Sequence, residues 1–271
     1  MDLSIDPQET KAILTSFIKT YVENAGNNSV VLGLSGGVDS AVVALLCKEA
    51  LGAKNVQCVF MPDETTPPTD TKHEQLLVKT FHLHCTEINI APFVHSFQAL
   101  HQRLRRMTIA NIKPRVRMIL LYEIANETGS IICGTSNKSE MLVGYFTKYG
   151  DGGVDFQPIG DLYKTQVCQL AHFLKIPKPI ITKPPTAGLW LGQTDEKELK
   201  MNYSTLDKIL YGLELKLKDV EIQREAGVTQ TQVERIRTMR VKSQHKRRTP
   251  MIPKLGIRTP GIDWRSPVQE G

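Results

Sequence analysis

Residues 35–40 read SGGVDS and lie between a short apolar run at residues 30–34 and the helix-forming sequence AVVALLCKEALG. A buried strand would deliver the backbone here, and two glycines let it fold tightly, so that successive N–H groups converge on an anion at a helix N-terminus. Ser35 and Ser40 add hydroxyl donors. The pattern predicts a cradle for the phosphate groups of a nucleotide. The alternative is an ordinary tight turn between strand and helix, which also uses Gly-Gly.

Asp39 within this loop indicates a divalent cation. A carboxylate beside phosphates is repulsive unless a cation such as Mg²⁺ lies between them. The loop also lacks the GK[ST] ending of the Walker loop, whose lysine reaches the β- and γ-phosphates, and this disfavours ordinary kinase or GTPase chemistry. We therefore expect the loop to hold pyrophosphate, with magnesium at Asp39.

A second polar motif, GTSNKSE at residues 134–140, follows another apolar run. If that run is a parallel strand, the motif lies at the same sheet edge as the first one. Thr135 can donate to a nucleotide, and Glu140 can supply a second oxygen ligand for the ion near Asp39. A helix cap would explain the serines and the asparagine of this motif equally well. Next to SGGVDS, we favour the functional interpretation.

The glycine-rich loop at residues 144–160 carries Lys148, Asp151 and Asp155. A solvated turn is one interpretation. A lysine and two carboxylates are more than a turn requires, however, and they suit a lid that orders over a charged substrate. Lys164 begins a predicted helix, where a cation is unfavourable for the helix macrodipole, and this also favours a functional role.

Two further groups of basic residues are candidates for substrate contacts. Arg115 and Arg117 precede a predicted helix, where arginines often form only surface ion pairs. His245 is followed directly by Lys246, whereas the other histidines predict no metal site.

Composition sets limits on the class of protein. The 271 residues are 41% hydrophobic and 23% charged, which is typical of a globular chain, and no apolar stretch is long enough to span a bilayer. Five scattered cysteines without CxxC spacing favour a reducing cytoplasm over a disulfide framework or a zinc site. The net charge of +6 lies in residues 240–271. Such a patch could serve nucleic acid, but a polyphosphate ligand needs the same cations, and we expect no nucleic-acid or membrane partner.

The elements that must position these residues alternate between strands and helices. This alternation predicts an α/β fold with a doubly wound parallel sheet, right-handed crossovers and extra C-terminal helices, all within a single domain. The expected strands cover residues 30–34, 56–61, 85–90 and 130–133. The expected helices cover residues 7–22, 41–51, 70–81, 92–105, 118–128, 164–174 and 206–217, with another capped by Thr229 and Gln232. Residues 250–271 are expected to form an irregular tail.

These motifs together resemble the NAD synthetases, which belong to the ATP-pyrophosphatase group with a Rossmann-like, adenine nucleotide α-hydrolase-like fold. SGGVDS is shared across the group. The segments NIKPRVRM, GTSNKSE, YFTKYGDGGVDFQPIGDLYKTQV, PPTAGLWLGQTDE and SQHKR, in this order, are similar to NAD synthetases in particular. The resemblance covers residues 10–250. One departure is Lys200, at a place where the family leads us to expect glycine.

The resemblance implies a role for each candidate residue. ATP would be bound by Gly33, Leu34, Ser35, Gly36, Gly37, Val38, Asp39, Ser40, Thr135, Lys164 and Thr186, and magnesium by Asp39 and Glu140. Deamido-NAD would be contacted by Arg115, Lys148, Asp155, His245 and Lys246. Asp151 and Lys164 would take part in catalysis, Asp151 from the loop that receives ammonia.

The implied reaction is the ATP-dependent amidation of deamido-NAD to NAD, through an adenylate, with release of AMP and pyrophosphate. About thirty residues precede the phosphate cradle, too few for an amidohydrolase domain, so free ammonia or a separate donor protein is the expected nitrogen source. A homodimer is expected from the family and from the apolar stripe of the first helix. The alternatives are another amidating or thiolating enzyme of the same group, or a non-catalytic nucleotide- or RNA-binding module.

Overall fold

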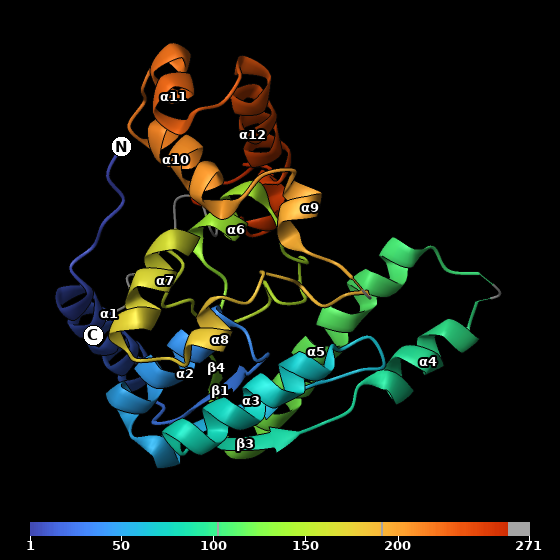
Figure 1. Ribbon diagram of the computed structural model, residues 1–271. Helices are drawn as coiled ribbons and strands as arrows, with labels where there is room; N and C mark the ends of the chain where they lie inside the picture. The colour runs from blue at the N-terminus through green and yellow to red at the C-terminus, as the bar shows by residue number, and fades with distance from the viewer. Residues whose placement is uncertain (102, 191, 260–271) are drawn as a thin grey trace.

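Four parallel strands form one sheet in the order β3-β2-β1-β4 in the computed structural model, which describes residues 1–101, 103–190 and 192–259 (Figure 1). The strands are β1 (Val30–Gly33), β2 (Val56–Phe60), β3 (His84–Glu87) and β4 (Ile131–Ile132). Val30 pairs with Val56 on one side and with Ile131 on the other. The chain therefore builds the sheet outward from β1 in one direction and then returns to its other side. The carboxyl ends of β1 and β4 flank this switch point, where open α/β sheets bind ligands.

Helices cover both faces of the sheet. On one face lie α1 (Pro7–Asn24), α2 (Val38–Leu51), α3 (Pro68–Phe81), α7 (Lys164–Phe173) and α8 (Lys178–Ile181). On the other face lie α4 (Ala91–Ala99) and α5 (Arg106–Thr128), which bury Val94 and Val116 against β1 and β2 residues. Strands covered on both faces read as continuous apolar runs, as VVLG in β1 does. The predicted doubly wound α/β fold is confirmed.

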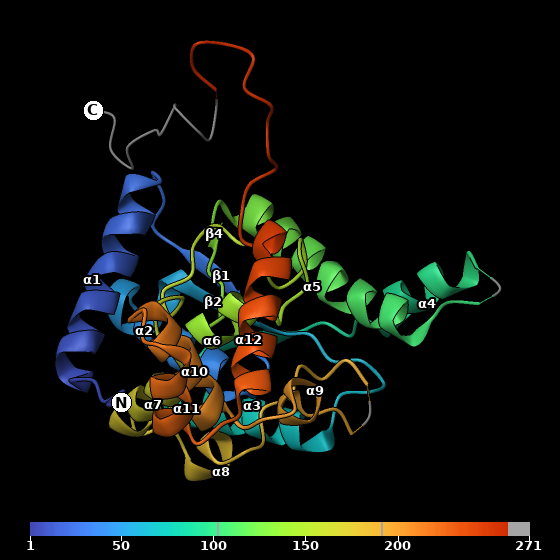
Figure 2. The same cartoon turned by 90° about the horizontal axis from the view of Figure 1, so that it is seen from above.

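A separate group of helices stands over the carboxyl edge of the sheet (Figures 1 and 2). It comprises α6 (Lys138–Val143), α9 (Asp195–Leu199), α10 (Tyr203–Glu214), α11 (Asp219–Ala226) and α12 (Gln230–Lys242), followed by the short turns of η2 (Gln244–Lys246). Its apolar core includes Leu206, Leu210 and Ile236, all fully buried. Because α6 directly follows the GTSN turn, this layer is tied to the switch point of the sheet.

Several predicted boundaries were wrong. Helix α5 begins at Arg106 and contains Pro114, although the sequence pattern placed Arg115 and Arg117 before a helix. Proline removes one hydrogen bond inside a helix. The helix continues because Lys113 and Pro114 are buried under neighbouring segments, so that tertiary packing offsets this cost. The ranges of α4, β3 and β4 are shorter than expected, and α6, α8, α9 and α11 were not predicted.

Local capping rules were more reliable. Asp6 accepts from the backbone N–H groups of Gln8 and Glu9 and begins α1, and Thr229 with Gln232 forms the predicted capping box of α12. Lys200, at the position where glycine was expected, is the C-cap of α9 with φ = +54°. This is the left-handed region that glycine adopts at least cost, so the expectation had a real conformational basis.

Two observations concern the chain as a whole. Residues 251–259 contain no helix or strand, as predicted for the tail, whereas residues 260–271 lie outside the described part. None of the described helices combines the length and apolar character needed to cross a membrane.

Candidate active site

A cavity of about 410 Å³ opens at the carboxyl edge of the sheet, beside the switch point. The segments that line it come from β1 and the SGGVDS loop, the end of β2, α5, the GTSNKSE turn, the 144–154 loop, the start of α7, and residues 183–190 with Gln193 and Asp195. Lys246, far along the chain, completes the wall. Thr135 and Thr186, both expected at the site, lie on this lining. The cavity has the size and mixed polarity of a site for a nucleotide-sized ligand.

The SGGVDS loop is held in a fixed shape by its own contacts. Gly36 has φ = +74°, and a Cβ atom there would lie 2.5 Å from the Asp70 carbonyl oxygen, so only glycine fits. The Ser40 hydroxyl accepts from the Ser35 N–H at 3.1 Å and donates to the Gly37 carbonyl at 3.1 Å. Helix α2 begins at Val38, three residues earlier than predicted, so its first free N–H groups belong to this loop. The result is a preformed anion site at a helix N-terminus.

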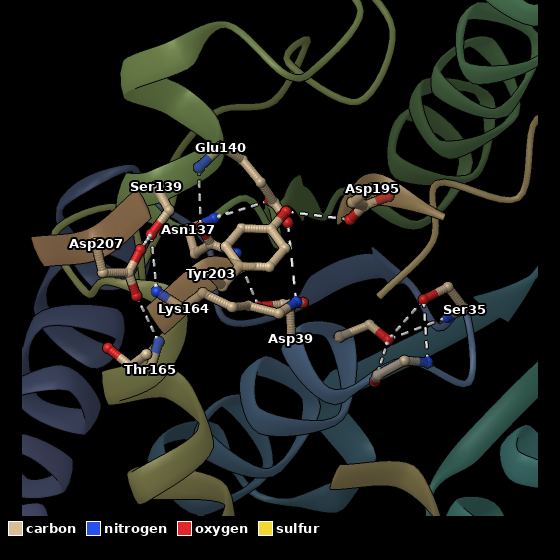
Figure 3. A network of polar contacts seen from close by, with 12 residues as sticks. Ser35, Asp39, Asn137, Ser139, Glu140, Lys164, Thr165, Asp195, Tyr203 and Asp207 are labelled. Atoms are coloured by element: carbon tan, nitrogen blue, oxygen red, sulfur yellow. Dashed lines mark hydrogen bonds and ion pairs between the residues drawn. The ribbon is translucent and has the colours of Figure 1, made fainter. Parts of the chain in front are cut away.

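Asp39 is held by contacts from two other segments (Figure 3). Its carboxylate forms an ion pair with the Lys164 ammonium and accepts from the Asn137 side-chain amide at 3.0 Å. The cation that the structure places against Asp39 is thus a lysine from α7. Asn137 does two tasks, since its Oδ1 also caps α6 by accepting from the Glu140 N–H at 3.0 Å. The helix-cap interpretation of the GTSNKSE turn is therefore confirmed, and the residue that caps α6 also contacts the SGGVDS loop.

Glu140 faces the same lysine. Its Oε1 lies 3.9 Å from Lys164 Nζ, and its side chain is 17% exposed. Burial, together with the nearby charge of Asp39, raises the pKa of Glu140 to about 8, although Lys164 acts in the opposite direction. The two carboxylates and the lysine form a compact group of opposite charges on the cavity wall.

Lys164 is the first residue of α7 and is 5% exposed. Burial would lower the pKa of its ammonium, but the charges of Asp39, Glu140 and Asp195 outweigh burial and raise it. Lys164 therefore remains a cation. A buried ammonium at the edge of an anion cradle can neutralise negative charge that develops on a bound phosphate.

Sequence reasoning missed two members of this group, Asp195 and Tyr203. The Tyr203 hydroxyl donates to Asp195 Oδ2 at 3.1 Å, and its ring lies 5.4 Å from Lys164 Nζ (Figure 3). Asp195 is 4% exposed, and its Oδ1 has no hydrogen-bond partner among the described residues. The signal available for Asp195 was its place in the GQTDE segment, whereas no sequence pattern distinguished Tyr203.

The 144–154 loop and Lys246 form the opposite wall. The Asp151 carboxylate is open to the cavity and accepts from the Thr147 N–H at 2.8 Å. The protein atoms around it desolvate the carboxyl group and raise its pKa. Lys246 Nζ donates to the carbonyls of Gly144 and Phe146 at 2.7 and 2.8 Å, and partial burial lowers its pKa despite the charge of Asp151. A carboxylate and a lysine thus face each other at the cavity mouth.

The sequence that forms this site matches a known protein family. Residues 11–250 match the NAD synthase family. The chain is a member of the NAD synthase family. It is 43% identical over 267 residues to an NH(3)-dependent NAD(+) synthetase of Pelodictyon phaeoclathratiforme, covering 97% of this chain and 95% of that one.

Solved structures agree with the family assignment. An NMN synthetase from Francisella tularensis has a TM-score of 0.83 and 32% identity, and an NH3-dependent NAD synthetase from Campylobacter jejuni has a TM-score of 0.79 and 31% identity. Each comparison covers 93% of this chain and 100% of the other chain. The NAD synthase fold therefore extends over nearly the whole molecule.

Not all of the residues expected at this NAD synthase site lie on the cavity wall. Within the described residues, those that lie outside its lining are Gly36, Arg115, Lys148, Asp155 and His245. The exposed Arg115 donates to the Lys148 carbonyl at 3.3 Å, and Asp155 accepts from the Ile132 N–H at 2.7 Å. His245 lines a separate depression between the end of α6 and α12, next to Lys246.

Helix α5 places a different arginine in the cavity. Arg117 lines the wall, and its Nε donates to the Met61 carbonyl at 2.9 Å. Burial lowers the pKa of this guanidinium despite the nearby charges of Asp63 and Asp151. Lys148, on the neighbouring loop, lies 5.1 Å from the Tyr149 ring. The spacing of Arg115 and Arg117 places them roughly 200° apart on a helix, which is why only one of them faces inward.

Proposed function

We propose that this protein forms NAD from deamido-NAD, ATP and ammonia, releasing AMP and pyrophosphate. One observation carries the proposal: the SGGVDS anion cradle and the ion-paired group of Lys164, Asp39 and Glu140 lie on the wall of one cavity. Membership of the NAD synthase family and the activity for which the Pelodictyon and Campylobacter relatives are named support the choice of substrates.

The chemistry needs a cradle of this kind. The nicotinate carboxylate of deamido-NAD is a poor electrophile, and attack of its oxygen on the α-phosphorus of ATP would convert it to an acyl-adenylate while the bond to pyrophosphate breaks. Backbone N–H groups at the start of α2 would hold the leaving pyrophosphate, and the Lys164 ammonium would offset its charge. Ammonia would then attack the acyl carbon, giving NAD and AMP, and the proton that ammonia loses would leave with solvent.

Mg²⁺ fits the donors present. Asp39 and Glu140 would hold the ion through one oxygen each, with phosphate oxygens and water as the other ligands, since magnesium sites at nucleotides use one or two carboxylates. When bound, the ion would neutralise phosphate charge. The Asp39 carboxylate would then contact the metal ion, and its ion pair with Lys164 would weaken.

The remaining candidate residues suit the second substrate. Lys246 would contact deamido-NAD on the cavity wall, Lys148 would contact it from outside the lining, and Asp151 would face the incoming ammonia. Arg115, Asp155 and His245 would meet the far end of the dinucleotide outside the cavity. Such a long substrate is consistent with contacts on both sides of the 144–154 loop.

A homodimer would complete this outer region. On α1, Ile13 and Phe17 are 59% and 43% exposed, and Phe17 belongs to an aromatic cluster with Tyr21 and Phe156. The Tyr21 hydroxyl donates to the Asp155 carbonyl at 2.8 Å, so this apolar surface adjoins a proposed substrate residue. Exposed aromatic patches of this kind often mark protein interfaces.

The five cysteines are unpaired, which suits a cytoplasmic location.

The activity for which the Francisella structure is named, NMN synthetase, favours one alternative substrate, a nicotinate mononucleotide in place of the dinucleotide. The test is to mix the purified protein with ATP, magnesium, ammonium and either acceptor, and to identify products by mass spectrometry. The proposal requires that the protein converts deamido-NAD to NAD. The kcat/KM of this reaction should be higher than that for amidation of the mononucleotide. Preference for the mononucleotide would reassign the substrate, and activity with glutamine as the sole nitrogen source would contradict the proposed use of ammonia.

A further inference from the structure

Asp207 on α10 is the most deeply placed charged group near the active site. It is 0% exposed, and it is not part of the cavity lining. Its carboxylate lies between the first turns of α6 and α7, the two helices that carry Glu140 and Lys164 (Figure 3). A carboxylate at the N-terminal ends of helices is stabilised by the macrodipole and by free N–H groups.

Both carboxylate oxygens of Asp207 are engaged. Oδ1 accepts from the Ser139 hydroxyl at 2.5 Å, and Oδ2 accepts from the Thr165 N–H at 2.9 Å. The Ser139 oxygen in turn accepts from the Lys164 N–H at 2.9 Å. One buried carboxylate therefore fixes two consecutive backbone N–H groups of α7, one directly and one through a serine of α6.

These contacts lie one residue away from the functional side chains. Ser139 precedes Glu140, and Thr165 follows Lys164. The 3.9 Å separation of Lys164 Nζ and Glu140 Oε1 depends on how the first turns of α6 and α7 are placed relative to each other. The link through Ser139 and Asp207 joins these two first turns, and a bond from the Lys138 N–H to the Leu162 carbonyl at 2.8 Å lies beside it.

We propose that Asp207 is a positioning residue for the active site, which holds Lys164 and Glu140 in their working geometry through the starts of α7 and α6. The inference rests on the proposed function. Anchoring of α10 alone does not require a buried carboxylate, because Leu206, Ile209 and Leu210 already bury the apolar face of this helix. Burying a charge is costly unless its hydrogen bonds are needed.

The test compares Asp207→Asn with Ser139→Ala and with the stability control Ile222→Val, which removes one methyl group from the buried face of α11. Asparagine keeps the volume of the side chain, but it has one acceptor oxygen and no charge. It therefore cannot accept from both the Ser139 hydroxyl and the Thr165 N–H as the carboxylate does. We expect Asp207→Asn to lower kcat for NAD formation about tenfold to a hundredfold, since small misplacements at a reacting centre have effects of this size. KM for ATP should stay within about threefold, because the backbone cradle is untouched.

Two further results decide the interpretation. Ser139→Ala should also lower kcat, and the double variant should fall no more than about threefold below Asp207→Asn, because both changes break one path. Ile222→Val should lower the melting temperature and leave kcat unchanged.

Two outcomes would overturn the inference. One is a folded Asp207→Asn protein with wild-type kcat, and the other is a loss of kcat in Ile222→Val equal to that in Asp207→Asn. If Asp207→Asn does not fold, Ser139→Ala decides alone, and wild-type kcat in it overturns the inference. Absence of NAD formation by the wild-type protein would instead refute the proposed function.

Discussion

The ammonium of Lys164 pairs with the carboxylate of Asp39, although 125 positions separate the two residues in the chain. The contact joins the phosphate cradle at the start of α2 to the start of α7, and it places a permanent positive charge at the edge of the anion site. Two helix N-termini, which each favour anions, thus converge on the same place.

Replacement of Asp39 should abolish most of the activity. Asp39→Asn keeps the shape of the side chain and the loop but removes the charge that pairs with Lys164 and would bind magnesium. We expect kcat for NAD formation to fall by about a hundredfold or more, which is typical for loss of a group that orders charge at a reacting centre. Asp161→Asn is the matched control, because Asp161 is 93% exposed and pairs only with Lys138 among the described residues. If Asp39→Asn kept most of its rate, this result would contradict the proposal that Asp39 binds magnesium during the reaction.

The stability of the protein should depend on the ionisation of Glu140. The pKa of this group rises from 4.5 to about 8 on folding, so the folded state binds more protons between these values and loses stability as pH rises through them. Glu140→Gln lacks this titration. In metal-free buffer, its free energy of unfolding should improve relative to wild type by about 4 kcal/mol between pH 5 and pH 9. Urea unfolding at both pH values measures this, with Glu127→Gln as an exposed control, and a difference that does not change with pH would contradict it.

Glycine at position 200 should stabilise the protein. Lys200 has φ = +54° at the end of α9, and glycine relieves the left-handed conformation at this site. We expect Lys200→Gly to raise the free energy of unfolding by about 0.5–1 kcal/mol. Lys197→Gly, inside the same helix, should lower it by about 1 kcal/mol. Thermal unfolding of the pair is the measurement, and destabilisation by both changes would contradict the conformational argument.

A charge on the exposed face of α1 should break the proposed homodimer. Phe17→Asp would place a carboxylate in the aromatic cluster next to Asp155. Sedimentation should change from dimer to monomer, and KM for deamido-NAD should rise about tenfold or more as the outer part of its site is lost. Val220→Asp, a similar change at a residue of α11 that is 74% exposed, should alter neither quantity. A fully active wild-type monomer at micromolar concentration would show that the interface is not needed.

Local rules predicted the parts of the site that local interactions form. The SGGVDS turn and the alternative interpretation of the GTSNKSE turn as a helix cap each depend on a few neighbouring residues, and the structure bears out these conformations. The glycine expected at position 200 came from the family resemblance, and it agrees with the left-handed φ found there. The doubly wound sheet followed from the alternation of apolar runs and helical stripes in the same way.

What the sequence could not predict depends on contacts between distant segments. The repulsion argument at Asp39 pointed to a metal ion, whereas Lys164 from α7 provides the contacting cation in the structure. Tyr203 and Asp207 come from a helix that reads as ordinary amphipathic sequence, and only its position over α6 and α7 gives them their partners. Pro114 continues α5 for the same reason, because burial outweighs a local preference.

The position at which ATP is cleaved tests the central claim most directly. Phosphorus NMR of a reaction with ATP, magnesium, ammonium and deamido-NAD identifies the spent nucleotide. A cradle that grips the β- and γ-phosphates, with Lys164 at its edge, predicts AMP and pyrophosphate in amounts equal to the NAD formed. ADP and orthophosphate, or cleavage that does not depend on deamido-NAD, would contradict the proposed role of this site.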